Sequence, residues 1–215
     1  SKWIADAGDQ MLCGSCWAIA TAGVVADNFV VRNLVQWKPH LSTTWCLACY
    51  PQHKCQGGNP AVLLNDISRG GITTENCVDY SWCSEDPRCS GSATKHFEGS
   101  QNVNLSTLVP GCGCYDAKVP HYLFTIEKPQ LLAIGQGMTE DVYFSTVKKH
   151  IFKNGPVLGG FLVFKNFRTG AFTKVNGGVY LGNCSYDKDQ LTFDNRESSA
   201  ESYIGSHAVA VMGWG

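Results

Sequence analysis

The eleven cysteines of this 215-residue chain constrain its fold more than any other feature of its sequence. Cytosolic proteins rarely carry so many thiols, so the number indicates disulfide bonds formed in the secretory route, outside the cell or on a particle surface. Because the number is odd, we expect a free thiol or a missing partner. Two N-x-S sequons, at Asn104 and Asn183, are compatible with such a compartment.

Composition and charge argue against two other classes of protein. The formal net charge is −1 and no run of five or more basic residues occurs, which argues against a nucleic-acid partner. The uncharged stretch at positions 11–26 contains Gly and Ser, and it is shorter than the ~18 apolar residues of a membrane span. Residues 1–9 lack the hydrophobic segment of a signal peptide, so we expect a mature or trimmed chain rather than a primary translation product.

Two helices are predicted in the first third of the chain. Residues 16 to about 34 are apolar on nearly all sides, as in a helix buried in a lobe, and Ser15 suits its N-cap. A second helix should begin after Asn59, a good N-cap, with Pro60 in its first position. The glycines at positions 70–71 should end it.

The second half of the chain changes from helical to β patterns. A third helix is predicted at residues 139–154, with Phe144, Val147 and Ile151 on one face and a Gly-Pro pair ending it. Beyond this helix, three short runs rich in Val and Gly have the character of buried strands: PVLGGFLVF, GGVYL and HAVAVMGW. The patterns therefore indicate a helical, disulfide-rich part followed by a mostly β part, with the changeover near residues 115–125.

Cys13 and Cys16 form a C-x-x-C pair, which suits three kinds of chemistry. A thioredoxin-like redox pair should follow a strand within a βαβ unit, and the segment before Cys13 offers no convincing strand. A zinc site would combine this pair with Cys46 and Cys49, but the gap between the two pairs exceeds the usual ~15–20 residues. In the third interpretation Cys16 is a nucleophile and Cys13 is a structural cysteine beside it.

The nucleophile interpretation accounts for more of the neighbouring residues. A thiol reacts as its thiolate, and the N-terminus of a helix stabilises negative charge. Cys16 stands where the first predicted helix begins, and Trp17 supplies a bulky wall beside it. Gln10 can offer its side-chain amide to an oxyanion, alongside the backbone N–H of Cys16.

Gln10 followed by CGSCW resembles the active-site signature of papain-family cysteine proteases. Three further stretches resemble that family in the same order: LSTTWC at positions 41–46, CQGGNP at 55–60 and GSHAVAVMGWG at 205–215. NGPVLGGFLVF, with the later GGVY and GWG, resembles the cathepsin B-like branch. On these motifs the chain is identified as a member of the family over nearly its whole length.

The resemblance implies an α+β, papain-like fold of two lobes with the active-site cleft between them. The helical, disulfide-rich lobe would comprise residues 1–118, and the β-barrel-like lobe would comprise residues 119–215. Cys16 on the first lobe would be the nucleophile, and His207 on the second would act as general base and then as general acid. Gln10 would donate a hydrogen bond to the oxyanion.

The resemblance also implies which residues bind the substrate. Gly57 and Gly58 would lie beside it, where missing side chains let two backbones pair as strands. Asn59 and Pro60 would edge the pocket for the second residue before the scissile bond. Trp17 would form a wall of the site.

The implied function is that of a cysteine endopeptidase that hydrolyses peptide bonds by a thiolate–imidazolium dyad of Cys16 and His207, through a thioester at Cys16 and without a metal or cofactor. Its partners would be peptide or protein substrates, its own propeptide and cystatin-like inhibitors, and its location would be a lysosome, a vacuole or the extracellular space. Two alternatives stay open: a catalytically inactive, disulfide-rich binding protein with this fold, and a thiol–disulfide oxidoreductase. A disulfide between Cys13 and Cys55 is implied as well.

Two differences from the family pattern and one polar segment lead to further expectations. The family orients its histidine with an asparagine beyond the GWG strand, and no Asn or Asp follows His207, so we expect a C-terminal part outside this chain or an inactive relative. Cathepsin B trims C-terminal dipeptides with a loop that contains two adjacent histidines. No such pair occurs here, and CSEDPRC at positions 83–89 carries acids, which predicts internal cleavage. The polar segment 183–204 predicts a mobile surface loop.

Overall fold

The protein, seen in a computed structural model, forms two compact units: Ser1–Gly159 with Val209–Gly215, and Gly160–Ala208. The structure describes residues 8–11, 13–50, 52, 54–81, 83, 105, 109–114, 116, 118, 122–133, 135, 137–164, 167, 180, 185–187, 192–194 and 203–214. The predicted lobes, 1–118 and 119–215, are not tested by this division and stay a prediction.

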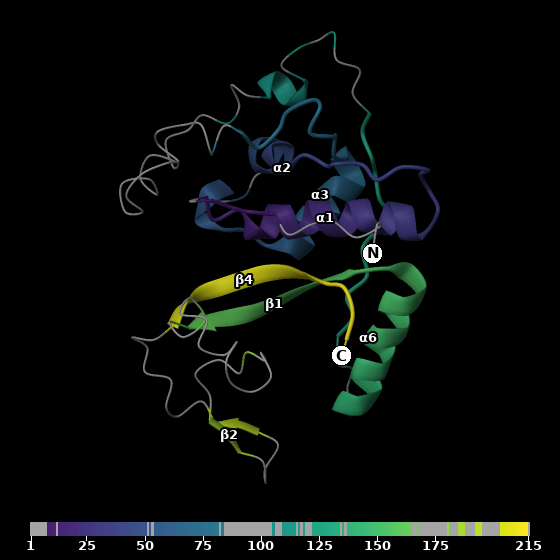
Figure 1. The fold of residues 1–215 in the computed structure, drawn as a ribbon, viewed down its shortest axis with the longest axis vertical. Helices are drawn as coiled ribbons and strands as arrows, with labels where there is room; N and C mark the ends of the chain where they lie inside the picture. Colours follow the sequence, from purple (N-terminus) through teal and green to yellow (C-terminus); the bar gives the residue numbers. More distant parts are fainter. Residues whose placement is uncertain are drawn as a thin grey trace. The chain divides into compact units, whose positions relative to one another are not determined.

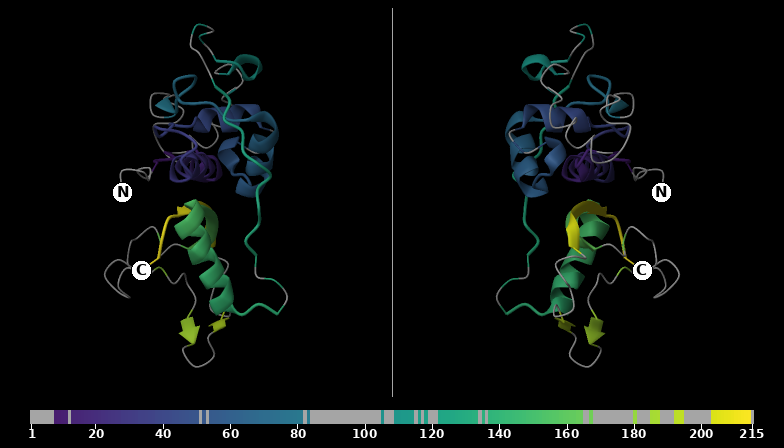
Figure 2. Two further views of the ribbon diagram at one scale, coloured as in Figure 1. Left: turned by 90° about the vertical axis from the view of Figure 1, so that its right-hand side faces the viewer. Right: turned by 90° about the vertical axis from the view of Figure 1, so that its left-hand side faces the viewer.

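The described elements combine helices with short sheets, which confirms the predicted α+β class (Figure 1). Figures 1 and 2 both show α1, α2 and α3 gathered together, and α1 packs on the other two. The elements in chain order are α1 (Cys16–Val31), α2 (Thr43–Cys49), the 3-10 turn η1 (Lys54–Gln56), α3 (Pro60–Gly70), the 3-10 turn η3 (Pro110–Cys112), α6 (Glu140–Asn154), β1 (Val157–Phe164), β2 (Ser185–Asp187), β3 (Thr192–Asp194) and β4 (Tyr203–Val211).

Helix α1 is the buried centre of the first unit, as its apolar sequence predicts. Most of its side chains are buried, on every face of the helix. It ends about three residues before the predicted end near Leu34. Asn33 has a φ of 54°, in the left-handed region, and the N–H of Leu34 donates to the carbonyl of Phe29 at 2.8 Å. That geometry is a common helix C-terminus, so the helix stops before Leu34.

Helix α3 begins and ends where its local sequence predicts. The Asn59 side chain accepts a hydrogen bond from the N–H of Ala61 at 2.9 Å, and Pro60 occupies the first turn. Gly71 follows the helix with a φ of 77°, a conformation that glycine adopts without strain. These caps fix the segment that joins the CQGGNP motif to the helical core.

Three disulfides are present among the described residues, and they confirm the pairing of Cys13 with Cys55 that the resemblance implied. Because Cys13 and Cys49 are both disulfide-bonded, the two C-x-x-C pairs do not form a shared zinc site. The LSTTWC motif ends at Cys46, yet Cys46 is a free, buried thiol and its neighbour Cys49 forms the bridge. The pairs are Cys13–Cys55, Cys49–Cys112 and Cys77–Cys114.

Helix α6 confirms the helix predicted at residues 139–154. The Thr139 side chain accepts from the N–H of Val142 at 3.4 Å, and Gly155, with a φ of 99°, ends the helix. The predicted apolar face is only partly correct, because Ile151 is buried whereas Phe144 is 53% exposed. Phe144 therefore lies outside the stripe that packs inward.

Strands β1 and β4 pair with each other and lie side by side in Figure 1, which confirms two of the three predicted strand segments. The third, GGVYL, lies outside the described residues except for Tyr180. Strands β2 and β3 form an antiparallel ladder in which Tyr186 pairs with Phe193. That ladder lies within segment 183–204, so the segment is not irregular throughout as a simple loop would be.

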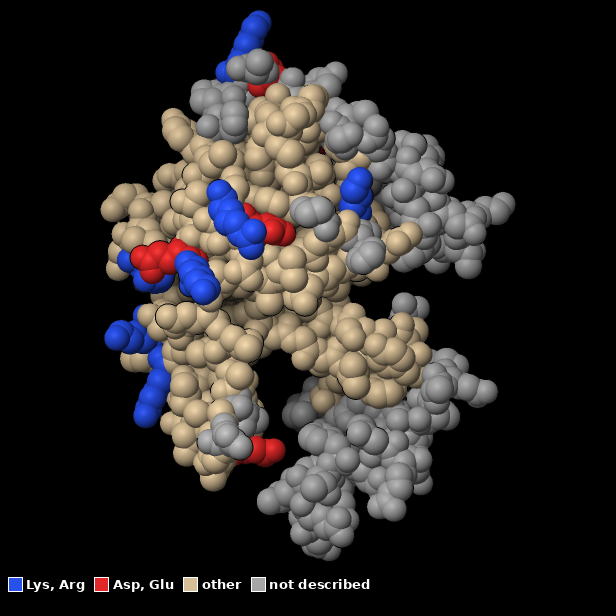
Figure 3. Space-filling view, turned by 180° about the vertical axis from the view of Figure 1, so that it is seen from behind, with Lys and Arg blue, Asp and Glu red and all other residues tan. Residues whose placement is uncertain are grey.

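The surface carries few charges for its size. On the face in Figure 3, acidic and basic side chains are scattered over a mostly uncharged surface. One ion pair lies largely inside the protein, where Lys38 Nζ is 2.7 Å from the carboxylate of the buried Asp27. None of the helices in the described part of the chain combines the length and apolar character needed to cross a bilayer.

Candidate active site

Cys16 is a free, half-buried thiol at the first position of α1. Its backbone N–H has no acceptor within the helix, because the first N–H groups of any helix lack one. The preceding turn is closely tied: Cys13 N–H donates to the carbonyl of Gln10 at 3.1 Å, and Ser15 N–H donates to that of Cys13 at 2.7 Å. A free sulfur and a free backbone donor therefore lie together on a fixed turn.

Gly14 shows why this turn needs a glycine. Its N–H donates to the carbonyl of Cys55 at 2.8 Å, beside the Cys13–Cys55 disulfide. A Cβ atom at position 14 would lie 2.4 Å from that carbonyl oxygen, closer than such atoms approach. The disulfide and the backbone hydrogen bond thus hold the CGSCW and CQGGNP motifs in van der Waals contact.

Ser15 occupies the predicted N-cap position of α1, but its side chain does not cap the helix. Its backbone angles, φ −96° and ψ 11°, depart from the extended conformation typical of an N-cap. The hydroxyl instead lies 2.7 Å from the hydroxyl of Tyr80. Tyr80 also donates to the backbone carbonyl of Gln10 at 3.0 Å. The Ser15 hydroxyl therefore accepts no hydrogen bond from the N–H groups of the first turn of α1.

Gln10, the predicted oxyanion donor, is half-buried next to this turn. Its backbone carbonyl accepts two hydrogen bonds, from Cys13 and from Tyr80. Its side-chain oxygen is buried and has no partner within the part of the chain that the structure describes. The backbone of Gln10 is thus fixed, while its carboxamide oxygen has no hydrogen-bond partner among the described residues.

Trp17 has no exposed surface, and its indole N–H donates to the carbonyl of Lys54 at 3.0 Å. A Cβ atom at Gly58 would lie 2.4 Å from the Trp17 ring, so Gly58 rests directly on the indole. Trp17 therefore supports the Gly57–Gly58 segment from beneath. Any contribution it makes to substrate binding is through that segment.

Gly57 and Gly58 are followed by a turn that the side chain of Gln52 holds in place. Gln52 Oε1 accepts from the N–H of Asn59 at 2.6 Å, and its Nε2 donates to the Asn59 carbonyl at 3.4 Å. Gly57 has a φ of 109° and open space where a Cβ would stand. Asn59 is exposed and Pro60 half-exposed at the start of α3. Nothing in the sequence motif pointed to Gln52.

His207 lies on β4, in the second unit, and is half-buried. Partial burial lowers the pKa of His207 below its usual value, because desolvation penalises the charged imidazolium. Burial therefore favours the neutral ring, which is the form that can accept a proton. The pairing of His207 with Cys16 of the first unit stays a prediction.

An aromatic group in the same unit lies on one side of the His207 ring. Phe161 on β1 contacts His207 edge to face, with ring centroids 5.7 Å apart. Phe161 in turn contacts Phe167 at 5.2 Å and Tyr180 at 5.7 Å. The Tyr180 hydroxyl accepts from the N–H of Phe164 at 2.9 Å, which ties the group to β1. These rings hold the imidazole from one side.

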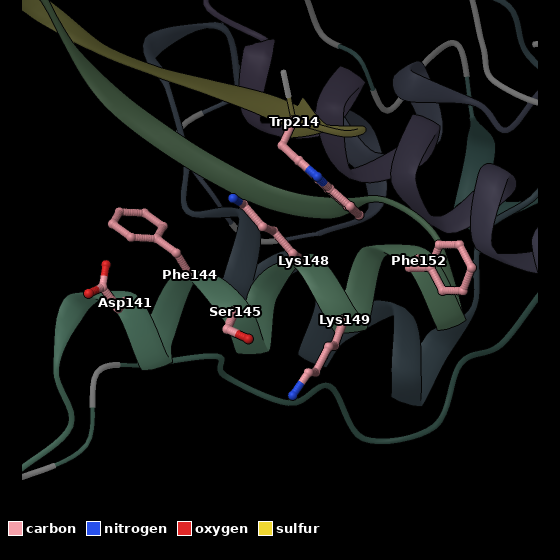
Figure 4. A pocket seen from close by; sticks show the side chains of 7 residues that line it. All are labelled: Asp141, Phe144, Ser145, Lys148, Lys149, Phe152 and Trp214. Atoms are coloured by element: carbon pink, nitrogen blue, oxygen red, sulfur yellow. The ribbon is translucent and has the colours of Figure 1, made fainter.

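A hollow on the exposed side of α6 contains none of the predicted site residues (Figure 4). In Figure 4 the Trp214 side chain lies opposite α6, above Lys148. The aromatic rings of Phe152 and Trp214 are largely exposed there. The residues that line the hollow are Asp141, Phe144, Ser145, Lys148, Lys149, Phe152 and Trp214.

Comparison with known proteins connects this geometry to one family. The family model described as papain family cysteine protease matches residues 1–215. The chain is 49% identical over 219 residues to the probable cysteine proteinase 024R of Invertebrate iridescent virus 3, which covers 100% of this chain and 44% of that protein. It is 38% identical over 238 residues to the probable cysteine proteinase 361L of Invertebrate iridescent virus 6, covering 100% of this chain and 43% of that protein.

A solved structure gives the same indication for the fold. The procathepsin B S9 of Trypanosoma congolense superposes with a TM-score of 0.57 at 21% identity, over 99% of this chain and 57% of that one. This likeness confirms the papain-like fold. The chain spans less than half the length of the two curated relatives named above.

Proposed function

Because this chain belongs to the papain family of cysteine proteases, we propose that it carries the catalytic machinery of a cysteine endopeptidase. One observation carries the proposal: a free, half-buried thiol stands at the first position of α1, on a turn fixed by the Cys13–Cys55 disulfide. A nucleophile requires both an accessible sulfur and a fixed position. The same disulfide argues against a redox pair, because Cys13 is bonded to Cys55 and not to Cys16.

In the proposed first step the Cys16 thiol has transferred its proton to His207, and the resulting thiolate of this thiolate–imidazolium dyad attacks the carbonyl carbon of the scissile peptide bond. A C–S bond forms, and the carbonyl electrons move to oxygen. The N–H of Cys16 and the side-chain amide of Gln10 donate hydrogen bonds to that oxyanion. The C–N bond then breaks, His207 returns the proton to the departing amine, and a thioester remains at Cys16.

In the second step water hydrolyses the thioester. His207 accepts a proton from the water while the water oxygen attacks the thioester carbonyl carbon. The N–H of Cys16 and the side-chain amide of Gln10 again donate to the oxyanion. The C–S bond breaks, the proton returns to the Cys16 sulfur, and the carboxylic acid leaves. A neutral His207, favoured by its partial burial, is the form that accepts a proton.

Gly57 and Gly58 are proposed to pair with the substrate backbone, with Asn59 and Pro60 at the edge of the pocket. The open space at Gly57 and the exposed backbone at Gly58 support that role. Peptide or protein substrates, a propeptide and cystatin-like inhibitors are the proposed partners. The disulfides support a proposed location in the secretory route, a lysosome, a vacuole or the extracellular space.

A thiol-reactive peptidyl probe, followed by mapping of the labelled residue, tests the proposal. Cys16 should be labelled and peptide hydrolysis should be lost in Cys16→Ala, with little change in stability because Cys16 closes no disulfide. Cys46 is the matched control, because it is the other free thiol among the described residues. It has no exposed surface, and burial raises its pKa, so it should stay unlabelled. Labelling of Cys16 without any hydrolysis would instead indicate an inactive binding protein.

A further inference from the structure

The hydroxyl of Tyr80 connects the two segments on either side of Cys13. It lies 2.7 Å from Ser15 Oγ and donates to the backbone carbonyl of Gln10 at 3.0 Å. Both partners are far away in sequence, at separations of 65 and 70 residues. The turn before Cys16 is therefore held from two sides, by the Cys13–Cys55 disulfide and by Tyr80.

The direction of these hydrogen bonds follows from counting hydrogens. A phenol has one hydrogen and a backbone carbonyl can only accept, so Tyr80 donates to Gln10 and must accept from Ser15. The Ser15 hydroxyl also has one hydrogen. Its distance to Tyr80 is 2.7 Å and its distance to the Cys13 carbonyl is 3.4 Å, so the hydrogen points to Tyr80. The two hydrogen bonds form a relay from Ser15 through Tyr80 to Gln10, and each bond polarises the next.

Two features keep this relay of hydrogen bonds intact under ordinary conditions. Ser15 has no exposed surface, so water does not readily replace its partner. Burial raises the pKa of Tyr80 to about 12, so the phenol keeps its hydrogen across the physiological range. Because the Ser15 hydroxyl is held by Tyr80, it does not cap the first turn of α1, and the N–H of Cys16 has no acceptor within the helix.

We propose that Tyr80 is a positioning residue for the oxyanion-binding groups of this site. Through the Gln10 carbonyl it fixes the residue whose side-chain amide donates to the oxyanion. Through Ser15 it fixes the start of α1, and with it the N–H of Cys16. This inference rests on the proposed function. Donors stabilise a transition state only when they are held in place beforehand, and a misplacement of about 1 Å can cost ~100-fold in rate.

Tyr80→Phe tests the proposal, because it removes the hydroxyl and keeps the ring. Tyr50→Phe is the matched control: Tyr50 OH donates to the carbonyl of Gly71, and burial raises its pKa to about 12 as well. The experiment uses the whole protein and measures kcat and KM on a peptide amide, melting temperature, and hydrogen exchange of backbone amides 13 and 15. Gln10→Ala and the double variant Gln10→Ala/Tyr80→Phe complete a double-mutant cycle.

Tyr80→Phe should lose about tenfold in kcat with KM changed less than about twofold, since the oxyanion groups act in the transition state. Tyr50→Phe should keep the kcat of the unaltered protein, while its melting temperature should fall by about as much as that of Tyr80→Phe. In the Gln10→Ala background the Tyr80→Phe effect should shrink to about threefold or less, because one of its two targets is gone. The amides of Cys13 and Ser15 should exchange faster in Tyr80→Phe only.

Five outcomes decide whether Tyr80 positions the oxyanion-binding groups. A kcat for Tyr80→Phe equal to that of Tyr50→Phe overturns the inference, and so does a tenfold loss that persists without the Gln10 amide. If the unaltered protein hydrolyses no peptide, the proposed function fails, and hydrogen exchange then decides the positioning role alone. Unchanged exchange at Cys13 and Ser15 in Tyr80→Phe overturns that role, whereas faster exchange supports it.

Discussion

Removal of the Cys13–Cys55 disulfide should both destabilise the protein and loosen the turn before Cys16. Its two cysteines are 42 residues apart, for which the chain-entropy relation gives a loss of about 4 kcal/mol in the free energy of unfolding. Cys77 and Cys114 are 37 residues apart, and the same relation gives about 4 kcal/mol for that bridge. The double variants that replace each pair with alanine are therefore expected to be equally destabilised.

The two double variants should differ in their chemistry. Without the first disulfide, folded molecules should still be alkylated at Cys16, because alkylation needs a reactive sulfur and no oxyanion donor. Peptide hydrolysis per folded molecule should fall about tenfold or more, since small misplacements of catalytic groups are costly. Removal of the Cys77–Cys114 bridge should leave hydrolysis per folded molecule near that of the unaltered protein.

Urea unfolding measures the free energy of unfolding of each double variant. Iodoacetamide labelling gives the rate of alkylation at Cys16, and cleavage of a peptide amide gives the rate of hydrolysis. Each rate is divided by the folded fraction. Equal hydrolysis by both variants would refute the link between the disulfide and the position of Cys16. Disulfide mapping that finds Cys13 bonded to Cys16 in the native protein would refute the nucleophile proposal itself.

Three further predictions concern other parts of the molecule. Because burial lowers the folded-state pKa of His207, the unfolded chain binds more protons, so the free energy of unfolding should fall as pH drops through and below about 6.5. Urea titrations at pH 5 and 7 should show a smaller fall in His207→Gln than in the unaltered protein. Equal falls in the two proteins would contradict this prediction. Lys38→Met should cost about 2–3 kcal/mol in urea unfolding, since it removes the charge beside the buried Asp27 carboxylate, and Asp27→Asn added to it should restore part of that loss. A peptide with a free C-terminus and its amidated form should be cleaved internally at similar rates, and rapid release of C-terminal dipeptides from the free form alone would disprove this.

Local signals predicted the ends of helices better than they predicted the faces that pack. Asn59 and Gly71 define the ends of α3 by themselves, because a capping side chain and a left-handed backbone act within one turn. Phe144 depends on what packs against α6, which the helical period cannot reveal. It is 53% exposed although its spacing to Ile151 suits a shared face.

The disulfides show the same limit. Cys46 ends the LSTTWC segment and Cys49 follows it on the same helix, α2, so the sequence alone does not say which of the two forms a bridge. The structure buries Cys46 completely and bonds Cys49 to Cys112, a partner 63 residues away. The choice depends on which side of a short helix faces the core, and the helix is too short for its hydrophobic pattern to decide.

The residues that hold the candidate site were invisible in the sequence for a related reason. Cys16 and Gln10 sit in a short motif whose spacing is itself informative. Tyr80 and Gln52 act through a single hydroxyl and a single amide, at positions with no recognisable pattern around them. Their roles depend on distances between segments far apart in the chain, so only the folded structure reveals them.

The CGSCW and CQGGNP motifs are best understood as two halves of one packed unit. Gly14 must be a glycine because the Cys55 carbonyl occupies the place of its side chain, and Gly58 must be one because the Trp17 ring does. The disulfide from Cys13 then closes the junction. Each motif has a glycine where the other has a group that fills the space of a side chain. A substitution in one motif should therefore displace residues of the other. Their joint presence is therefore a single structural requirement, which positions the proposed nucleophile and the proposed substrate-binding backbone together.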